Sequence, residues 1–249
     1  MVSQKTKWVG MTVADIQRRW GHKALRKLER PATIASFPHI STGFPALDQA
    51  LEIGGLAKGR VSELFGPVTS GKTTMALEFL VQAQAGGGQV GYVDYARLFD
   101  PDYAYRCGLD LSRLLIVAPY DLEEALAMTE ALVRGGGLSA LVFDGLGALG
   151  DDAEAAPLLA AYLGRLVAPL ARSDTVVLFL HALMKRRSLA LAHHATVRLH
   201  VVRGHWLRRY HDVRGYEAKI QVLKNRLGPA GRAVTVVIKL NGTVRGNGL

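Results

Sequence analysis

The feature that most constrains the fold is the stretch GPVTSGKTT, which lies between an apolar run and a helix-forming run. Its spacing satisfies G-x-x-x-x-G-K-[ST], the pattern of a phosphate-binding loop that joins a β-strand to an α-helix. In such a loop Lys72 is expected to reach the β- and γ-phosphates, and the Thr73 hydroxyl to hold Mg²⁺. The predicted phosphate-site residues are Gly66, Pro67, Val68, Thr69, Ser70, Gly71, Lys72, Thr73 and Thr74.

The chain after residue 40 alternates between strand-like and helix-like segments. Short, near-continuous apolar runs are expected to form strands at residues 60–66, 89–95, 113–119, 139–145 and 175–181. Segments with the apolar spacing of helices lie between these runs. This alternation indicates the doubly wound α/β class, a mostly parallel sheet flanked by helices. After residue 195 three strand-like runs follow without helices between them, so antiparallel strands are expected at the C-terminal end.

A carboxylate is expected close to the phosphate-binding loop. The run SALVFDG places Asp144 directly after four apolar residues. An acid at the end of a neighbouring strand anchors Mg²⁺ in proteins that carry this loop, where it is called the Walker B aspartate. The sequence therefore predicts a Mg²⁺ site formed by Thr73 and Asp144.

Charge is distributed unevenly along the 249 residues. Residues 1–30 carry 8 Lys and Arg against 2 acids, and residues 181–249 carry 14 against 2. This clustering favours contact with a polyanion such as nucleic acid over an ordinary solvated surface. The chain has no uncharged apolar run of membrane-spanning length and begins without a secretory signal, so a soluble, cytoplasmic protein is expected. The single Cys107 excludes an internal disulfide.

The string ISTGFPALDQALEIGGLAKGRVSELFGPVTSGKTT resembles the opening of the ATPase core in the bacterial RecA recombinase family. The resemblance continues through DPDYAYRCGLDLSRLLI, LVFDGLGAL, ATVRLHV and VLKNRLGP. It implies a RecA-like core at residues 36–249 that binds ATP and Mg²⁺. It also implies that residues 1–35 form a basic helical extension that packs against a neighbouring subunit, and that the family's C-terminal domain is absent.

The resemblance assigns roles to residues outside the phosphate-binding loop. By matching position, Asp100 and Tyr103 would contact the adenine, which an acceptor and a flat aromatic ring can do. Lys224 and Arg226 match the cations that the family extends into the ATP site of the neighbouring subunit, in the manner of an arginine finger.

One departure from the family pattern bears on ATP hydrolysis. Where the family has a glutamate that positions the attacking water, this chain has Ala96, and a methyl group cannot polarise water. Asp94 lies two residues earlier, on the same side of an alternating strand, and is a weak substitute. Slow or absent hydrolysis is therefore expected.

The other departures bear on signalling and DNA contact. His181 stands where the family has a glutamine that senses the γ-phosphate, and a phosphate sensor and a structural histidine fit equally well. The family's second DNA-binding loop is long and rich in glycine, whereas here a short segment takes its place. The first loop, GDDAEAAPLL, is acidic, and acids beside a phosphate path repel DNA.

Two basic segments offer a different surface for DNA. The first is the run KRR, and the second is RGHWLRRYHDVRGY, in which aromatic residues alternate with arginines as suits base stacking beside phosphate pairing. The alternative for the second segment is a hairpin with packed aromatic rings and solvated arginines. The predicted DNA-binding residues are Lys185, Arg186, Arg187, Arg203, Trp206, Arg208 and Arg209.

Two functions remain open. The first is an ATP-dependent protein of recombination or repair that binds single-stranded DNA, hydrolyses ATP weakly and forms a homo-oligomer or filament. The alternative is a non-catalytic paralogue that regulates a recombinase or translesion polymerase within a hetero-assembly. A RecA-fold ATPase unrelated to DNA is disfavoured by the basic ends. No membrane partner is expected.

Overall fold

The computed structural model describes residues 4–22, 24–25, 37–146, 155–182, 188–209 and 212–239. Residue contacts group the chain into two compact units, Met1–Ser36 and Phe37–Leu249. The first unit contains helix α1 (Gln4–Trp20), whose last turn carries Arg18 and Arg19. Among the described residues no helix combines the length and the apolar character needed to cross a membrane.

The second unit is built on an eight-stranded sheet with the order β10-β9-β8-β3-β7-β6-β4-β5. Neighbours from β8 to β5 run parallel, whereas β9 pairs antiparallel with both β8 and β10. The predicted α/β class with antiparallel strands at the C-terminal end is therefore confirmed. The strands are β3 (Val61–Phe65), β4 (Gln89–Asp94), β5 (Leu114–Val117), β6 (Leu138–Asp144), β7 (Val176–His181), β8 (Val197–Arg209), β9 (Asp212–Asn225) and β10 (Ala233–Lys239).

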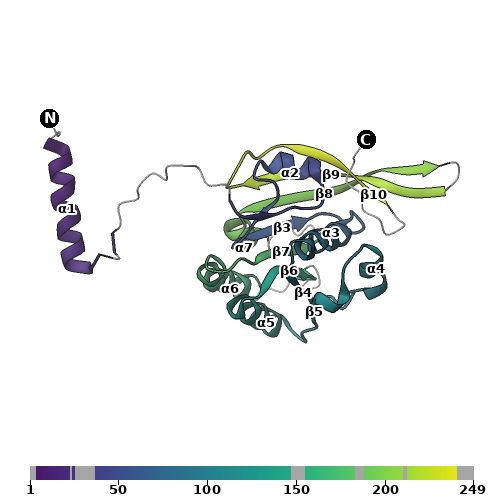
Figure 1. The fold of residues 1–249 in the computed structure, drawn as a ribbon, viewed down its shortest axis with the longest axis horizontal. Coiled ribbons are helices and arrows are strands. Elements are labelled where there is room, and N and C mark those ends of the chain that lie inside the picture. Colours follow the sequence, from purple (N-terminus) through teal and green to yellow (C-terminus); the bar gives the residue numbers. More distant parts are fainter. Residues whose placement is uncertain are drawn as a thin grey trace. The chain divides into compact units, whose positions relative to one another are not determined.

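Helices cover both faces of this sheet (Figure 1). One apolar core packs α3 against residues of β3, β9 and β10, and the other packs α5, α6 and α7 against β6 and β7. The central strands are buried on both faces, which explains why their sequences are mostly apolar. The helices are α2 (Pro45–Leu51), α3 (Lys72–Ala85), α4 (Pro101–Arg106), α5 (Leu122–Gly135), α6 (Ala155–Leu170) and α7 (Ser188–His194), with a 3₁₀ turn at Leu111–Arg113.

Two smaller features complete the unit. Strands β1 (His39–Ile40) and β2 (Leu56–Ala57) form a separate antiparallel pair. Strands β8 and β9 form a long hairpin that continues past the rest of the sheet (Figure 1). Strand β8 is buried near Val197 and mostly exposed from Val202 onward, whereas Tyr216 and Ala218 of β9 remain buried.

Sheet order determines which strand ends meet. Strand β7 lies between β3, which leads into the phosphate-binding loop, and β6, which ends at Asp144. Asp94 at the end of β4 pairs in register with Asp144, and Phe65 at the end of β3 pairs with His181 at the end of β7. Since these strands are parallel, their carboxyl ends place the candidate residues along one edge of the sheet.

Candidate nucleotide site

The loop between β3 and α3 is fixed by glycines at its two ends. A Cβ atom on Gly66 would lie 2.0 Å from the Val201 carbonyl oxygen, so only glycine fits there. Gly71 has a φ of +100°, a left-handed conformation that favours glycine, and a Cβ there would lie 2.4 Å from Ile238 Cδ1. The predicted strand, loop and helix start thus occur where the motif indicated, with α3 beginning at Lys72.

The loop carries groups suited to a phosphate chain. The Ser70 hydroxyl is buried and has no hydrogen-bond partner in the described part of the chain. Lys72 Nζ donates to the Gly66 and Pro67 carbonyls at 3.0 and 2.7 Å, which places its charge inside the loop. Burial lowers the pKa of the Lys72 ammonium, and the charge of Asp144 acts against this. An ammonium, an orphaned hydroxyl and a helix N-terminus together fit a bound polyphosphate.

Asp144 has a partner that the sequence analysis missed. Tyr92, on β4, donates its hydroxyl to Asp144 Oδ2 at 2.6 Å. Burial raises the pKa of the Asp144 carboxyl, and the Tyr92 hydrogen bond opposes that rise. The bond orients the carboxylate at the edge of the sheet. Thr73, in the first turn of α3, is exposed, and its hydroxyl and the Asp144 carboxylate are oxygen ligands of the kind that the predicted Mg²⁺ site needs.

The carboxylate of Asp94 is engaged by its own turn. It is buried, and its two oxygens accept from the backbone N–H groups of Leu98 and Phe99 at 2.9 and 3.0 Å. Ala96 lies in this turn, against the residue that follows Asp144. A Cβ on Gly145 would come within 2.5 Å of Ala96 N and 2.9 Å of Ala96 Cβ. A methyl group therefore stands beside the end of β6 that carries Asp144.

The two residues expected at the adenine lie on α4. Asp100 is its N-cap and accepts from the Tyr103 N–H at 3.0 Å. The Tyr103 hydroxyl shares a hydrogen bond of 2.7 Å with Thr74 Oγ1, in the first turn of α3. Tyr103 is thereby tied to the helix that follows the phosphate-binding loop.

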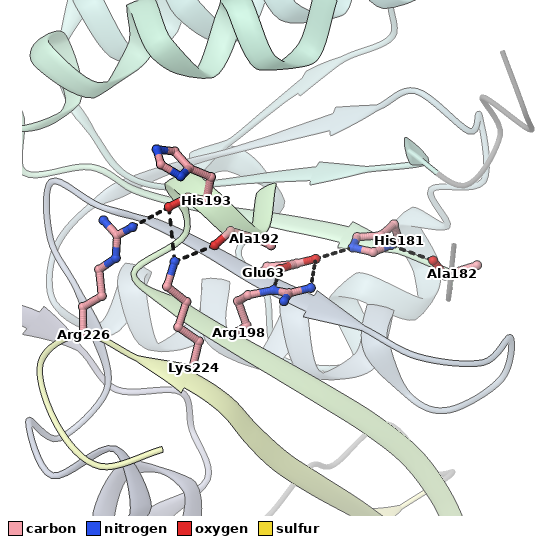
Figure 2. A network of polar contacts seen from close by, with 8 residues as sticks. All are labelled: Glu63, His181, Ala182, Ala192, His193, Arg198, Lys224 and Arg226. Carbon is pink, nitrogen blue, oxygen red and sulfur yellow. Dashed lines mark hydrogen bonds and ion pairs between the residues drawn. The ribbon is translucent and has the colours of Figure 1, made fainter. Parts of the chain in front are cut away.

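His181 belongs to a buried polar network (Figure 2). Its Nε2 lies 2.7 Å from Glu63 Oε1 and its Nδ1 lies 2.6 Å from the Ala182 carbonyl oxygen. Arg198 forms an ion pair with the same Glu63 carboxylate, and the His181 ring stacks on Phe65. Burial opposes ionisation of Glu63, yet the hydrogen bonds from His181 and Arg198 outweigh it and hold its pKa below the ordinary value. The structure thus gives His181 definite structural partners.

The two cations that the family resemblance places in a neighbouring ATP site lie at one helix end (Figure 2). Lys224 Nζ donates to the Ala192 carbonyl at 2.5 Å and to the His193 carbonyl at 3.2 Å. Arg226 donates to the same His193 carbonyl. Burial, together with the charges of Arg226 and Arg198, lowers the pKa of Lys224. Both side chains neutralise the C-terminus of α7.

The predicted DNA-binding residues fall into three groups. Lys185, Arg186 and Arg187 lie outside the described residues. Arg208 and Arg209 are exposed at the far end of β8. Arg203 and Trp206 instead line a cavity of about 360 Å³ together with Tyr216 and the phosphate-binding residues Thr69–Thr74. The composition of the segment indicated a polyanion surface, but it did not indicate this proximity to the loop.

Comparison with known proteins gives one consistent result. A family model described as the RecA N-terminal domain matches residues 7–244. Proteins named Protein RecA from Rhizobium rhizogenes and Sinorhizobium medicae are each 34% identical over 254 residues, covering 92% of this chain and 70% of the relative. Protein RecA of Methylococcus capsulatus is 33% identical over 256 residues, covering 93% of this chain and 74% of the relative.

Proposed function

Because the chain belongs to the RecA family, we propose that it is an ATP-dependent protein of recombination or DNA repair that acts on single-stranded DNA in the cytoplasm. Its proposed core is residues 36–249, with residues 1–35 as a subunit-packing extension. ATP and Mg²⁺ bind at the carboxyl ends of β3 and β6, and ATP acts mainly as a switch of assembly, with weak hydrolysis.

The observation that carries this proposal is a complete phosphate site beside an incomplete hydrolytic one. Lys72, Thr73 and Asp144 supply the ammonium, hydroxyl and carboxylate that hold a triphosphate and its Mg²⁺. When bound, Mg²⁺ neutralises charge that develops on the phosphates. Ala96 offers no group to orient water, and the Asp94 oxygens already accept two backbone N–H groups. Asp94 is thus at most a weak substitute for the glutamate.

Assembly on DNA follows from the same kinship. We assign single-stranded DNA to the basic side chains of β8 at Arg208 and Arg209 and to the run 185–187. In a homo-oligomer or filament, Lys224 and Arg226 would leave the α7 carbonyls to meet the ATP of a neighbouring subunit. Replacing helix carbonyls by phosphate oxygens as hydrogen-bond acceptors is favourable, because phosphate carries full negative charge.

A second function is favoured by Ala96 and His181. The His181 ring makes two hydrogen bonds to groups of its own chain, which a γ-phosphate sensor would have to give up. A protein that neither cleaves nor senses the γ-phosphate would act as a non-catalytic paralogue. Such a paralogue regulates a recombinase or translesion polymerase in a hetero-assembly. ATP would then stabilise the form that binds the partner.

The test of the shared part of both proposals is ligand binding. Calorimetry with Mg²⁺-ATP should give saturable binding by the native chain and none by Lys72→Ala, with unchanged circular dichroism as evidence of folding. Single-stranded DNA binding should weaken with added salt, with a log–log slope of about −0.7 for each phosphate contact. Native protein that binds neither ligand would exclude the proposal, and DNA binding insensitive to salt would exclude the basic surface.

A further inference from the structure

One wall of the phosphate-binding cavity comes from the β8–β9 hairpin of the same chain. The cavity of about 360 Å³ is bounded on one side by Thr69–Thr74 and on the other by Arg203, Trp206 and Tyr216. Two contacts set the spacing between these walls. Arg203 Nη1 donates to Thr69 Oγ1 at 3.3 Å. Gly71 approaches the hairpin so closely that a Cβ there would lie 2.8 Å from the Tyr216 hydroxyl.

The side chains of this wall are held in place by one another. The Arg203 guanidinium lies 4.7 Å from the centre of the Trp206 ring, in a cation–π contact. The Tyr216 ring also contacts Trp206 edge-on, with 5.5 Å between the ring centroids. Trp206 nevertheless remains 43% exposed, on a wall of the cavity. The Arg203 guanidinium and the Trp206 indole, held by these contacts, thus face the phosphate-binding loop.

We propose that Arg203 and Trp206 bind the nucleoside triphosphate of their own subunit, Arg203 through the phosphate chain and Trp206 by packing on the base and ribose. This inference rests on the proposed binding of ATP. A guanidinium matches phosphate oxygens geometrically and is always charged, so it adds to the charge of Lys72. Stacking on a flat ring suits any purine, and Tyr103 supplies a second aromatic group on the α4 side of α3.

The assignment separates the basic segment RGHWLRRYHDVRGY into two parts. Its first part, at Arg203 and Trp206, belongs to the nucleotide cavity. Its outer part, at Arg208 and Arg209, stays available to DNA because these side chains are exposed and do not line the cavity. The hairpin thereby joins the nucleotide to the DNA surface through a few residues of β8.

The test measures affinity for Mg²⁺-ATP and for inorganic tripolyphosphate by calorimetry. Trp206→Ala should weaken ATP about tenfold and tripolyphosphate little, because stacking on a base is lost while phosphate contacts remain. Trp206→Phe should bind ATP within about twofold of the native chain, since an aromatic face is kept. Arg203→Ala should weaken both ligands about tenfold. His205→Ala is the matched control, an exposed neighbour on β8 that does not line the cavity.

A fluorescence measurement gives an independent readout. In a Trp8→Phe, Trp20→Phe background, Trp206 is the remaining tryptophan of the sequence. Excitation of this indole should transfer energy to a bound N-methylanthraniloyl-ATP, and unlabelled ATP should reverse the transfer. If Arg203→Ala and Trp206→Ala bind ATP as tightly as the native chain but lose single-stranded DNA binding, the inference is overturned. The proposed function would still stand. A native chain that binds no ATP would overturn both.

Discussion

At the scale of single residues, the polar network around Glu63 links β3 to His181 at the carboxyl end of β7. His181 Nδ1 lies 2.6 Å from the Ala182 carbonyl oxygen, and His181 Nε2 lies 2.7 Å from Glu63 Oε1. The structure therefore holds the His181 ring between a carbonyl and a carboxylate, next to the end of β3.

Replacing Glu63 by Gln should destabilise the fold. The change leaves the Arg198 guanidinium and the His181 ring without their shared carboxylate, at a cost of about 3 kcal/mol in the free energy of unfolding at pH 7. Urea unfolding measures this cost. Glu130→Gln, which removes a carboxylate paired with the exposed side chains of Arg134 and Arg165, is the control and should cost less than about 1 kcal/mol. Equal costs would contradict the network.

The same carboxylate predicts a pH dependence. Its pKa lies below the ordinary 4.5 in the folded chain, so it binds protons less readily folded than unfolded. Its stabilising contribution is complete above the ordinary pKa and is lost as pH falls through the lowered one. The difference in unfolding free energy between native chain and Glu63→Gln should therefore shrink below about pH 4.5. A difference that grows on acidification would contradict this sign.

At the scale of elements, the phosphate-binding loop depends on contacts across the sheet. Gly66→Ala should weaken ATP binding at least tenfold and lower stability by about 2 kcal/mol, because its Cβ would overlap the Val201 carbonyl of β8. Gly164→Ala is the matched control, since this glycine lies inside α6 with nothing within 4 Å of a Cβ. It should raise stability by about 0.5–1 kcal/mol through helix propensity and leave ATP binding unchanged. Thermal unfolding and calorimetry measure both variants.

Local sequence patterns predicted most helices and strands, because hydrophobic periodicity and turn residues act over short distances along the chain. The run at Val61–Phe65, the loop glycines and the start of α3 could all be predicted from spacing alone. Glu63 offered a signal that was available but unused. A charged residue within a mostly apolar, buried strand needs a buried partner. The identity of that partner is not a local property, since His181 lies 118 positions away.

The position of the hairpin also depended on non-local geometry. Composition led to the prediction that Arg203 and Trp206 bind DNA, and it gave no sign that they lie near the phosphate-binding loop. Their place beside Thr69 follows from the pairing of β8 with β3 and from the register shifts between β8 and β9. Shifts of this kind re-aim side chains and cannot be predicted from alternation alone.

At the scale of the whole molecule, the two compact units predict separate roles. Unit Phe37–Leu249 has its own two apolar cores. Helix α1 exposes large apolar side chains, Trp8, Val9, Met11 and Trp20, which suit packing against another protein. Removing residues 1–36 should leave the melting temperature of the core nearly unchanged and reduce self-association in sedimentation experiments. A core that fails to fold without this segment would contradict the separation.

We propose that ATP is bound beside Ala96, where no side chain positions the attacking water. ATP turnover with and without single-stranded DNA tests it most directly, using the native chain, Lys72→Ala, Ala96→Glu and the uncharged control Ala96→Gln. Native protein should turn over ATP slowly under both conditions, and Ala96→Glu should be faster by about 10²-fold or more, while Ala96→Gln is not. Rapid turnover by the native chain with DNA, abolished by Lys72→Ala, would contradict the claim and identify an active recombinase-type ATPase.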